Sequence, residues 1–125
     1  MKKVINTNDA PAAIGPYSQA IEANGMLFIS GQVPINPKTS KVEAKTITEQ
    51  TKQVMKNIEA IVTEAGYTFA DVIKSTCLLS DIAYFGEMNE VYAKYYTENC
   101  PARAAYAVKD LPMGAMVEIE TIAVK

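Results

Sequence analysis

The middle of the sequence contains one long amphipathic helix whose two ends are both marked. Thr46 followed three residues later by Glu49 forms a capping-box pattern, which satisfies free backbone N–H groups at a helix start. Gly66 is the residue type that commonly ends a helix. Between them, mostly apolar side chains recur at helical spacing: Ile47, Thr51, Val54, Met55, Ile58, Ile61, Val62 and Ala65. A stripe of this width has to pack against a second layer of structure.

Six other segments are predicted to be β-strands. They are Lys2–Thr7, Tyr17–Ala23, Met26–Ser30, Val72–Leu79, Ala104–Val108 and Met116–Val124. A second helix is expected after its cap Asp81, with a stripe of Phe85, Met88, Tyr92, Tyr95 and Tyr96 that is more typical of a core than of a binding platform. The order β-β-β-α-β-α-β-β favours a single α/β domain over residues 1–125, an α+β mixed sheet of six strands with both helices on one face.

The last two strands are predicted to form a β-hairpin. Leu111-Pro112-Met113-Gly114 suits a type I turn between them, with proline at its second position. In the corresponding register, Arg103 and Ala105 share one face of the sheet with Glu118 and Glu120, so an arginine and two carboxylates line one wall. Arg103 and Glu118 are then about 13 Å apart along the strands. A ligand, or a neighbouring chain, is needed to complete such a site.

The strand Val72–Leu79 indicates that the chain does not act alone. Its apolar residues Val72, Ile73, Cys77, Leu78 and Leu79 point to both faces, whereas two helices cover only one face of the sheet. A copy of the same chain is the simplest cover for the second face. We therefore expect a homo-oligomer with sites in the seams between subunits.

Composition excludes several classes of chemistry. The chain has no histidine, which removes the usual neutral-pH base and the commonest zinc ligand. Its two cysteines, Cys77 and Cys100, are too few for a disulfide scaffold and too far apart for a metal knuckle. With 12 basic and 14 acidic residues there is no basic patch for nucleic acid. Neither a signal peptide nor a membrane-spanning run is found, so a cytoplasmic location is expected.

Two residues are the main candidates for chemistry. Arg103 suits a clamp for a substrate carboxylate, because a guanidinium presents two parallel donors; the alternative is a structural ion pair with Glu118 or Glu120. Glu118 suits a general base, because apolar surroundings raise a carboxyl pKa; the alternative is the partner of Arg103. Both alternatives remain open from the residues.

Four further residues are weaker candidates. Tyr17 begins a predicted strand and is either a pocket hydroxyl or a packing residue. Ser30-Gly31 ends a predicted strand and suits either ligand contact or a plain turn. Asn89 follows Met88 on the second helix, where a solvated role is the common one. No glycine-rich phosphate cradle and no Schiff-base lysine are indicated.

The chain resembles the RidA family of reactive-intermediate deaminases, formerly named after YjgF. The motifs that carry the resemblance are residues 10–19 (APAAIGPYSQ), 30–34 (SGQVP), Pro101-Ala102-Arg103, Leu111-Pro112 and residues 117–120 (VEIE). The resemblance implies a homotrimer of chorismate-mutase-like subunits with three clefts between subunits and no cofactor or metal. It also implies Arg103 as the holder of the substrate carboxylate and Glu118 as the residue that positions the attacking water. Tyr17, Ser30, Gly31, Asn89 and the backbone of Ala105 would line the cleft.

The function implied by the resemblance is hydrolysis of 2-imino acids. Family members convert the enamine and imine products of pyridoxal-phosphate dehydratases, such as 2-iminobutanoate and 2-iminopropanoate, to a 2-keto acid and ammonia. One departure is Ala104-Ala105, where members active on these imines commonly have Ser-Cys. Two alternatives remain: a ribonuclease or translation inhibitor, and a non-catalytic trimer that binds small carboxylates or acts as a chaperone.

Overall fold

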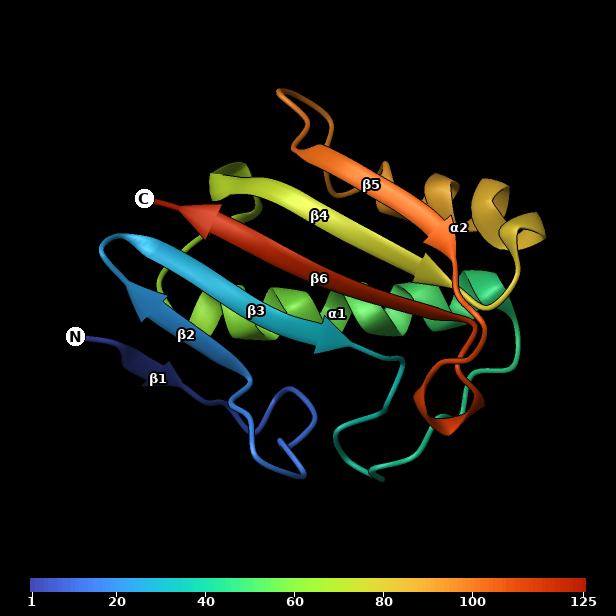
Figure 1. Ribbon diagram of the computed structural model, residues 1–125, viewed down its shortest axis with the longest axis horizontal. Helices are drawn as coiled ribbons and strands as arrows, with labels where there is room; N and C mark the ends of the chain where they lie inside the picture. Colours follow the sequence, from blue (N-terminus) through green and yellow to red (C-terminus); the bar gives the residue numbers. More distant parts are fainter.

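A computed structural model of the chain describes all residues, 1–125, and contains one mixed sheet of six strands (Figure 1). The sheet order is β1-β2-β3-β6-β4-β5. The strands are β1 (Lys3–Ile5), β2 (Ala20–Ala23), β3 (Met26–Gln32), β4 (Val72–Leu79), β5 (Ala102–Ala107) and β6 (Val117–Val124). All neighbours are antiparallel except β4 and β5, which are parallel. The predicted six-stranded mixed sheet is therefore confirmed.

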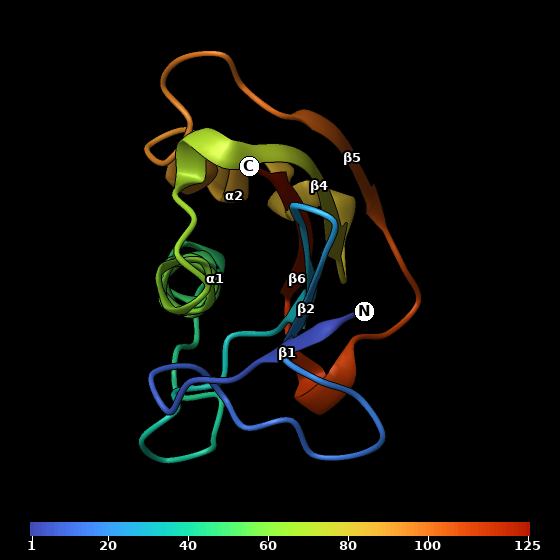
Figure 2. The same cartoon turned by 90° about the vertical axis from the view of Figure 1, so that its left-hand side faces the viewer.

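The two helices, α1 (Ile47–Glu64) and α2 (Phe85–Tyr92), lie on the same side of the sheet (Figure 2). Between the layers, 22 buried residues form one hydrophobic cluster, as expected when a helix stripe packs on a sheet face. The opposite face of the sheet carries no helix. None of the helices has the length and apolar character needed to cross a membrane.

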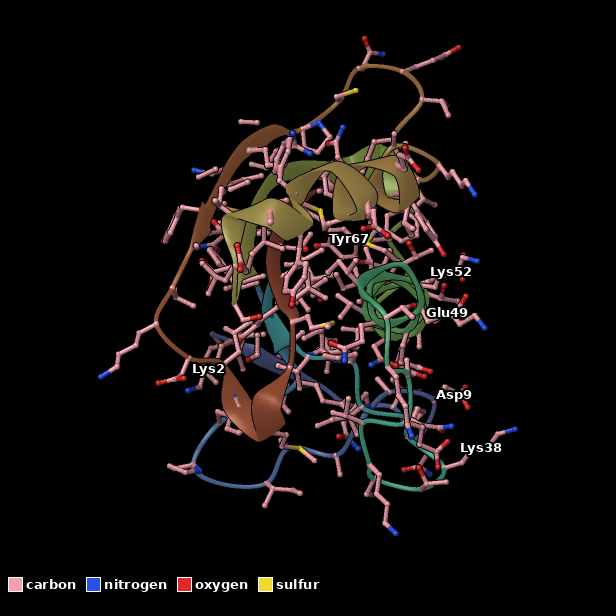
Figure 3. All side chains as sticks on the ribbon, turned by 90° about the vertical axis from the view of Figure 1, so that its right-hand side faces the viewer. Lys2, Asp9, Lys38, Glu49, Lys52 and Tyr67 are labelled. Atoms are coloured by element: carbon pink, nitrogen blue, oxygen red, sulfur yellow. The ribbon has the colours of Figure 1, made fainter.

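The predicted N-cap Thr46 and the glycine after α1 are confirmed, whereas only the Thr46 half of the predicted capping box is formed. The Thr46 hydroxyl accepts a hydrogen bond from the backbone N–H of Glu49 at 3.2 Å. Gly66 has a φ of +81°, the left-handed conformation in which glycine is favoured after a helix. Figure 3 shows Glu49 and Lys52 on the side of α1 that faces away from the sheet, and their 3.6 Å contact is the only ion pair in the chain.

The predicted hairpin of the last two strands is wrong, because β4 lies between β5 and β6. β4 pairs in parallel with β5, to which it is connected through α2, and antiparallel with β6. A strand–helix–strand unit joins parallel neighbours, and its central strand is covered on both edges. The connection from β5 to β6 also differs from a type I turn, since Met113 has a φ of +59°.

Some predicted strand bounds also differ from the structure. β2 begins at Ala20 instead of Tyr17, because residues before it form a loop held by side-chain hydrogen bonds. Gly31 lies inside β3 instead of ending it. Asp81 does not cap α2 itself. Its side chain accepts a hydrogen bond from the N–H of Ala83 at 2.9 Å and caps a short 3-10 helix (Ile82–Tyr84) that precedes α2.

The open face of the sheet carries a row of apolar side chains. Ile21 pairs with Phe28, and Phe28 pairs with Ile122, so these three residues lie side by side across β2, β3 and β6. Phe28 is 43% exposed in the single chain, and Val124 further along β6 is 39% exposed. A contiguous apolar row of this kind on a sheet face is typical of an interaction surface.

Candidate active site

A β-bulge in β3 shapes the candidate site. Ile29 pairs with Thr121 and Gln32 pairs with Ile119, so the register shifts between them at Ser30 and Gly31. Bulges of this kind re-aim side chains and are frequent next to active sites. The bulge lies on the open face of the sheet, beside the first half of β6.

Gly31 lets the Glu118 side chain lie directly against the β3 backbone. A Cβ atom at position 31 would be 2.9 Å from the carboxyl carbon of Glu118 and 3.2 Å from its Cγ, and it would overlap a carboxyl oxygen. Only a residue without a side chain leaves room for this carboxylate. The sequence signal for this contact was Ser30-Gly31 at the predicted end of a strand.

A cleft of about 670 Å³ opens beside this contact. It is lined by the loop before β2, the end of β3 with the following residues Val33 and Ile35, the turn residues Pro112 and Met113, and the carboxylates Glu118 and Glu120. Most of the wall is apolar and only a few polar groups converge on it, which is typical of a small-molecule site.

The loop before β2 is held by Gln19, which the residue-by-residue prediction missed. Its buried side chain accepts from the N–H of Thr7 at 2.7 Å and donates to the carbonyls of Thr7, Ala10 and Pro11 at 3.0, 3.3 and 2.8 Å. A glutamine between Ser18 and Ala20 gives no local signal of such a role. Its burial against loop carbonyls appears only in the folded chain.

Two further polar side chains fix the remaining walls. Asn57 of α1 donates to the carbonyls of Val33 and Ile35 at 3.2 and 3.0 Å, which holds the segment after β3. Gln50 of α1 accepts from the N–H of Met116 at 2.8 Å, which holds the chain just before β6. The long helix therefore positions the cleft as well as covering the sheet.

Glu118 is the acid with perturbed ionisation in this cleft. Its half-buried position raises its pKa above the ordinary value, and the nearby charge of Glu120 raises it further. A carboxylate in this environment is a better proton acceptor than an exposed one. The sequence-based expectation that the acids of β6 lie away from solvent therefore holds for the half-buried Glu118 and fails for Glu120, which is exposed in the single chain.

Tyr17 and Ser30 also lie in the cleft, where their hydroxyl groups form hydrogen bonds with the backbone of the loop before β2. The Ser30 hydroxyl donates to the carbonyl of Ser18 at 2.6 Å, and the Ser30 N–H donates to the carbonyl of Gln19 at 3.0 Å. The Tyr17 hydroxyl accepts from the N–H of Ile14 at 3.4 Å, and the side chain is 54% exposed. Tyr17 therefore has free hydrogen-bonding capacity at the cleft mouth.

Arg103 lies elsewhere in the chain, and the prediction that it shares a wall with Glu118 is wrong. Arg103 pairs with Ser75 of β4, whose buried side chain faces the helices, whereas Glu118 pairs with Leu78 on the open side. Because successive residues of a strand alternate in direction, Arg103 and Glu118 point to opposite faces. The mistake follows from the mistaken pairing of β5 with β6.

Asn89 and Ala105 lie with Arg103 and not with the cleft. An Nη1 hydrogen of Arg103 donates to the side-chain oxygen of Asn89 in α2 at 2.6 Å. Ala105 follows Arg103 on the same face of β5 and pairs with Cys77. The predicted site residues thus form two groups in one chain: Tyr17, Ser30, Gly31 and Glu118 in the cleft, and Asn89, Arg103 and Ala105 at the β5 edge of the sheet.

Arg103 is not neutralised by either glutamate. No carboxylate oxygen lies within 4.0 Å of its guanidinium, since the only ion pair of that length joins Lys52 and Glu49. The structural alternative for Arg103 and Glu118, in which they pair with each other, is therefore wrong for the single chain. The chain also contains no group of three or more histidine, cysteine or acidic residues arranged to hold a metal ion.

The sheet thus has helices on one face, a cleft with two carboxylates on the other and, at its β5 edge, an arginine without a carboxylate partner. The family model described as endoribonuclease L-PSP matches residues 7–125. A RutC family protein of Pyrococcus horikoshii is 54% identical over 125 residues, which are 100% of this chain and 99% of the relative.

Two further comparisons carry more specific names. The 2-iminobutanoate/2-iminopropanoate deaminase of Mus musculus is 47% identical over 125 residues, which cover 100% of this chain and 93% of the relative. The crystal structure of E. coli TdcF with bound serine superposes with a TM-score of 0.93 at 38% identity and covers 98% of both chains. The chain belongs to the RidA family, also called YjgF, as its motifs indicated.

Proposed function

We propose that this protein hydrolyses 2-imino acids, with 2-iminobutanoate and 2-iminopropanoate as substrates, to 2-keto acids and ammonia. Support comes from the family and from the name of the mouse relative. The serine bound by the E. coli relative is a small molecule with a carboxylate next to a carbon–nitrogen bond, which has the same recognition chemistry. The cytoplasm is the proposed place of action.

The observation that carries the proposal is that Arg103 and Glu118 are both free to act. The Arg103 guanidinium has one hydrogen bond to a neutral amide and no carboxylate partner, so it can bind a substrate carboxylate through two parallel hydrogen bonds. Glu118 lies in a cleft and its pKa is raised by burial, so it can accept a proton from water.

The two groups are proposed to meet between subunits of a homotrimer. In one chain they lie on opposite faces of the sheet, so no single substrate carboxylate and reacting carbon can contact both. The apolar row of Ile21, Phe28 and Ile122 gives a neighbouring copy a surface to cover. If the β5 edge of one copy lies over the cleft of the next, Arg103 and Glu118 share one site.

The proposed reaction needs only these groups. A protonated imine is already electrophilic, so an oriented water can form a bond to its carbon while Glu118 takes a proton from that water. Glu118 then returns that proton to the nitrogen of the carbinolamine, and ammonia leaves with the electrons of the carbon–nitrogen bond while the hydroxyl gives its proton to water and becomes the carbonyl. An enamine substrate must first gain a proton at carbon. The backbone N–H of Ala105 is the proposed second donor to the substrate carboxylate.

The test is a coupled assay. A dehydratase or an amino-acid oxidase generates 2-iminopropanoate or 2-iminobutanoate, and keto-acid release is followed with and without the protein. We expect acceleration by the wild-type chain and loss of acceleration in Arg103→Ala. No acceleration, or an undiminished rate in Arg103→Ala, would refute the proposal.

The description of the family model also names endoribonuclease activity, which is the second candidate function. The charge of the chain disfavours it, because phosphate binding draws mainly on lysine and arginine and the chain has 12 basic against 14 acidic residues. RNA cleavage that copurifies with the protein and is lost in Glu118→Gln would support it. Binding of a keto acid without turnover would support a non-catalytic binder instead.

A further inference from the structure

We infer that Tyr92 and Phe85 are positioning residues that hold the Arg103 guanidinium between α2 and β5; this inference rests on the proposed function of Arg103. The guanidinium carbon of Arg103 lies 4.8 Å from the ring centroid of Tyr92 and 5.3 Å from that of Phe85. Both distances are within the range in which a cation is attracted to an aromatic face. Arg103, Tyr92 and Phe85 form what we call the arginine cradle.

The cradle compensates for the position of Arg103 in the fold. β5 is the edge strand of the sheet and has a neighbour on one side only. An arginine on such a strand keeps much of its rotamer freedom, and a site that needs two parallel hydrogen bonds loses affinity when that freedom must be removed on binding. Contacts from α2 restrict the Arg103 side chain before the ligand binds, and so remove part of this rotamer freedom in advance.

The geometry of the cradle keeps part of the guanidinium available. Asn89 receives a hydrogen bond from Nη1, and the two rings contact the guanidinium without using its N–H donors. Nε and Nη2 have no partner within the chain. These two nitrogens point along one edge and match the two oxygens of a carboxylate.

Tyr92 is itself fixed by the layer beneath it. Its side chain is only 5% exposed, and its ring packs at 4.7 Å on Tyr96, which in turn packs at 5.5 Å against Phe69. Its buried hydroxyl lies on the inner side of α2, where Ser75 of β4, the register partner of Arg103, is also fully buried. Because Tyr92 belongs to the core, it can act as a stationary support for a surface arginine.

Kinetics test whether the cradle acts through substrate binding. In Tyr92→Leu the ring is lost, and we expect KM for the imine to rise by about fivefold with kcat changed by less than about twofold, as for an interaction made equally with substrate and transition state. Tyr92→Phe keeps the ring and should restore the wild-type KM. Tyr95→Leu is the matched control, because Tyr95 packs on Phe69 and does not contact Arg103.

An NMR measurement on the protein without substrate separates this inference from the proposed function. Two rings at these distances should shift the Arg103 side-chain proton resonances upfield through ring currents, and the shift should shrink in Tyr92→Leu and survive in Tyr95→Leu. If Tyr92→Leu fails to fold, Phe85→Leu gives the same readout with a smaller loss. Unchanged Arg103 resonances together with an unchanged KM would overturn the inference, whatever the imine assay shows.

Discussion

Replacing Gly31 by alanine should separate activity from stability. Gly31 is not in the left-handed region of backbone conformation, so alanine can adopt its backbone without strain. The new Cβ would be 2.9 Å from the carboxyl carbon of Glu118, a carbon–carbon distance well inside van der Waals contact. The neighbour that must move is the end of a flexible side chain, so Glu118 should turn away while the sheet stays intact.

The two contributions to stability nearly cancel. Alanine in place of glycine restricts the unfolded chain and stabilises by about 0.4–1 kcal/mol. Turning Glu118 toward a less favourable rotamer costs about 0.5–1.5 kcal/mol. We therefore expect the free energy of unfolding to change by less than about 1 kcal/mol, a small shift on the scale of ordinary mutations.

The effect on catalysis should be much larger. A positioned general base contributes about 10²–10⁴-fold to a rate, and displacing its carboxylate by more than an ångström forfeits much of that factor. We expect the rate of imine hydrolysis in Gly31→Ala to fall by at least about tenfold, mainly in kcat. The imine assay and urea unfolding, measured on the same preparations, supply the two quantities.

Gly86→Ala is the matched control, because a Cβ at position 86 would meet no atom within 4 Å. As an alanine inside α2 it should stabilise the protein by about 0.5–1 kcal/mol and leave imine hydrolysis unchanged. The reasoning is refuted if Gly31→Ala keeps full activity, since Glu118 would then either not move or not matter.

Three further predictions follow from the site and the open face. Arg103→Lys should raise KM for the imine by about tenfold to a hundredfold, because an ammonium cannot form two parallel hydrogen bonds and each bond to a charged group contributes about 1.5–3 kcal/mol; an unchanged KM would contradict a clamp. Glu118→Gln should stabilise the protein at pH 7 and much less at pH 4. Because the pKa of Glu118 is raised in the folded protein, the contribution of Glu118 to stability is complete below its unfolded-state pKa and is lost as pH rises through its folded-state pKa. Urea unfolding of both proteins at pH 4 and pH 7 tests this, and a larger stabilisation by Glu118→Gln at pH 4 than at pH 7 would contradict it. Phe28→Asp should convert the proposed trimer to monomers, as measured by light scattering, whereas Ile82→Asp, at a 58% exposed position outside the sheet, should not. If the Phe28→Asp variant is still a trimer, the subunit interface does not include the apolar row around Phe28.

The elements with local signals were predictable from the sequence. The N-cap at Thr46, the glycine after α1 and the bounds of Val72–Leu79 depend on residues that act on their own neighbours, and the structure agrees with each. The second half of the predicted capping box, a bond from the Thr46 N–H to the Glu49 side chain, is not formed. Apolar residues on both faces of β4 led to the prediction of a homo-oligomer, which stays a prediction. The same residues did not lead to the placement of β4 between β5 and β6 that the structure has.

Strand pairing was the point at which local reasoning failed. A proline and a glycine between two strands suggested a hairpin, but β5 gains more by pairing in parallel with β4, because α2 brings it back over the same edge. That single error moved Arg103 to the wrong face of the sheet. Because side chains along a strand alternate between the two faces of a sheet, a wrong strand pairing can also place site residues on the wrong face.

The cleft was only partly predictable. Glu118 and Gly31 were named from their types and places, but their direct contact depends on a bulge that no residue pattern announces. Gln19 was named only within a family motif, since its role depends on carbonyls up to twelve positions earlier in the chain. A polar side chain that hydrogen-bonds to backbone groups far away in the sequence can be recognised only when the positions of both partners are known.

The amide of Gln19 also sets how the rim of the cleft can move. Residues 8–19 have no strand or helix of their own, yet their fastening is a side chain only 2% exposed, at the base of β2. In amide hydrogen exchange the Thr7 N–H, bonded to that side chain, should therefore belong to the slow class that reports global opening, although it sits in irregular chain. A cleft built this way should keep its shape until the whole protein unfolds, so ligand binding carries no cost of ordering residues 8–19.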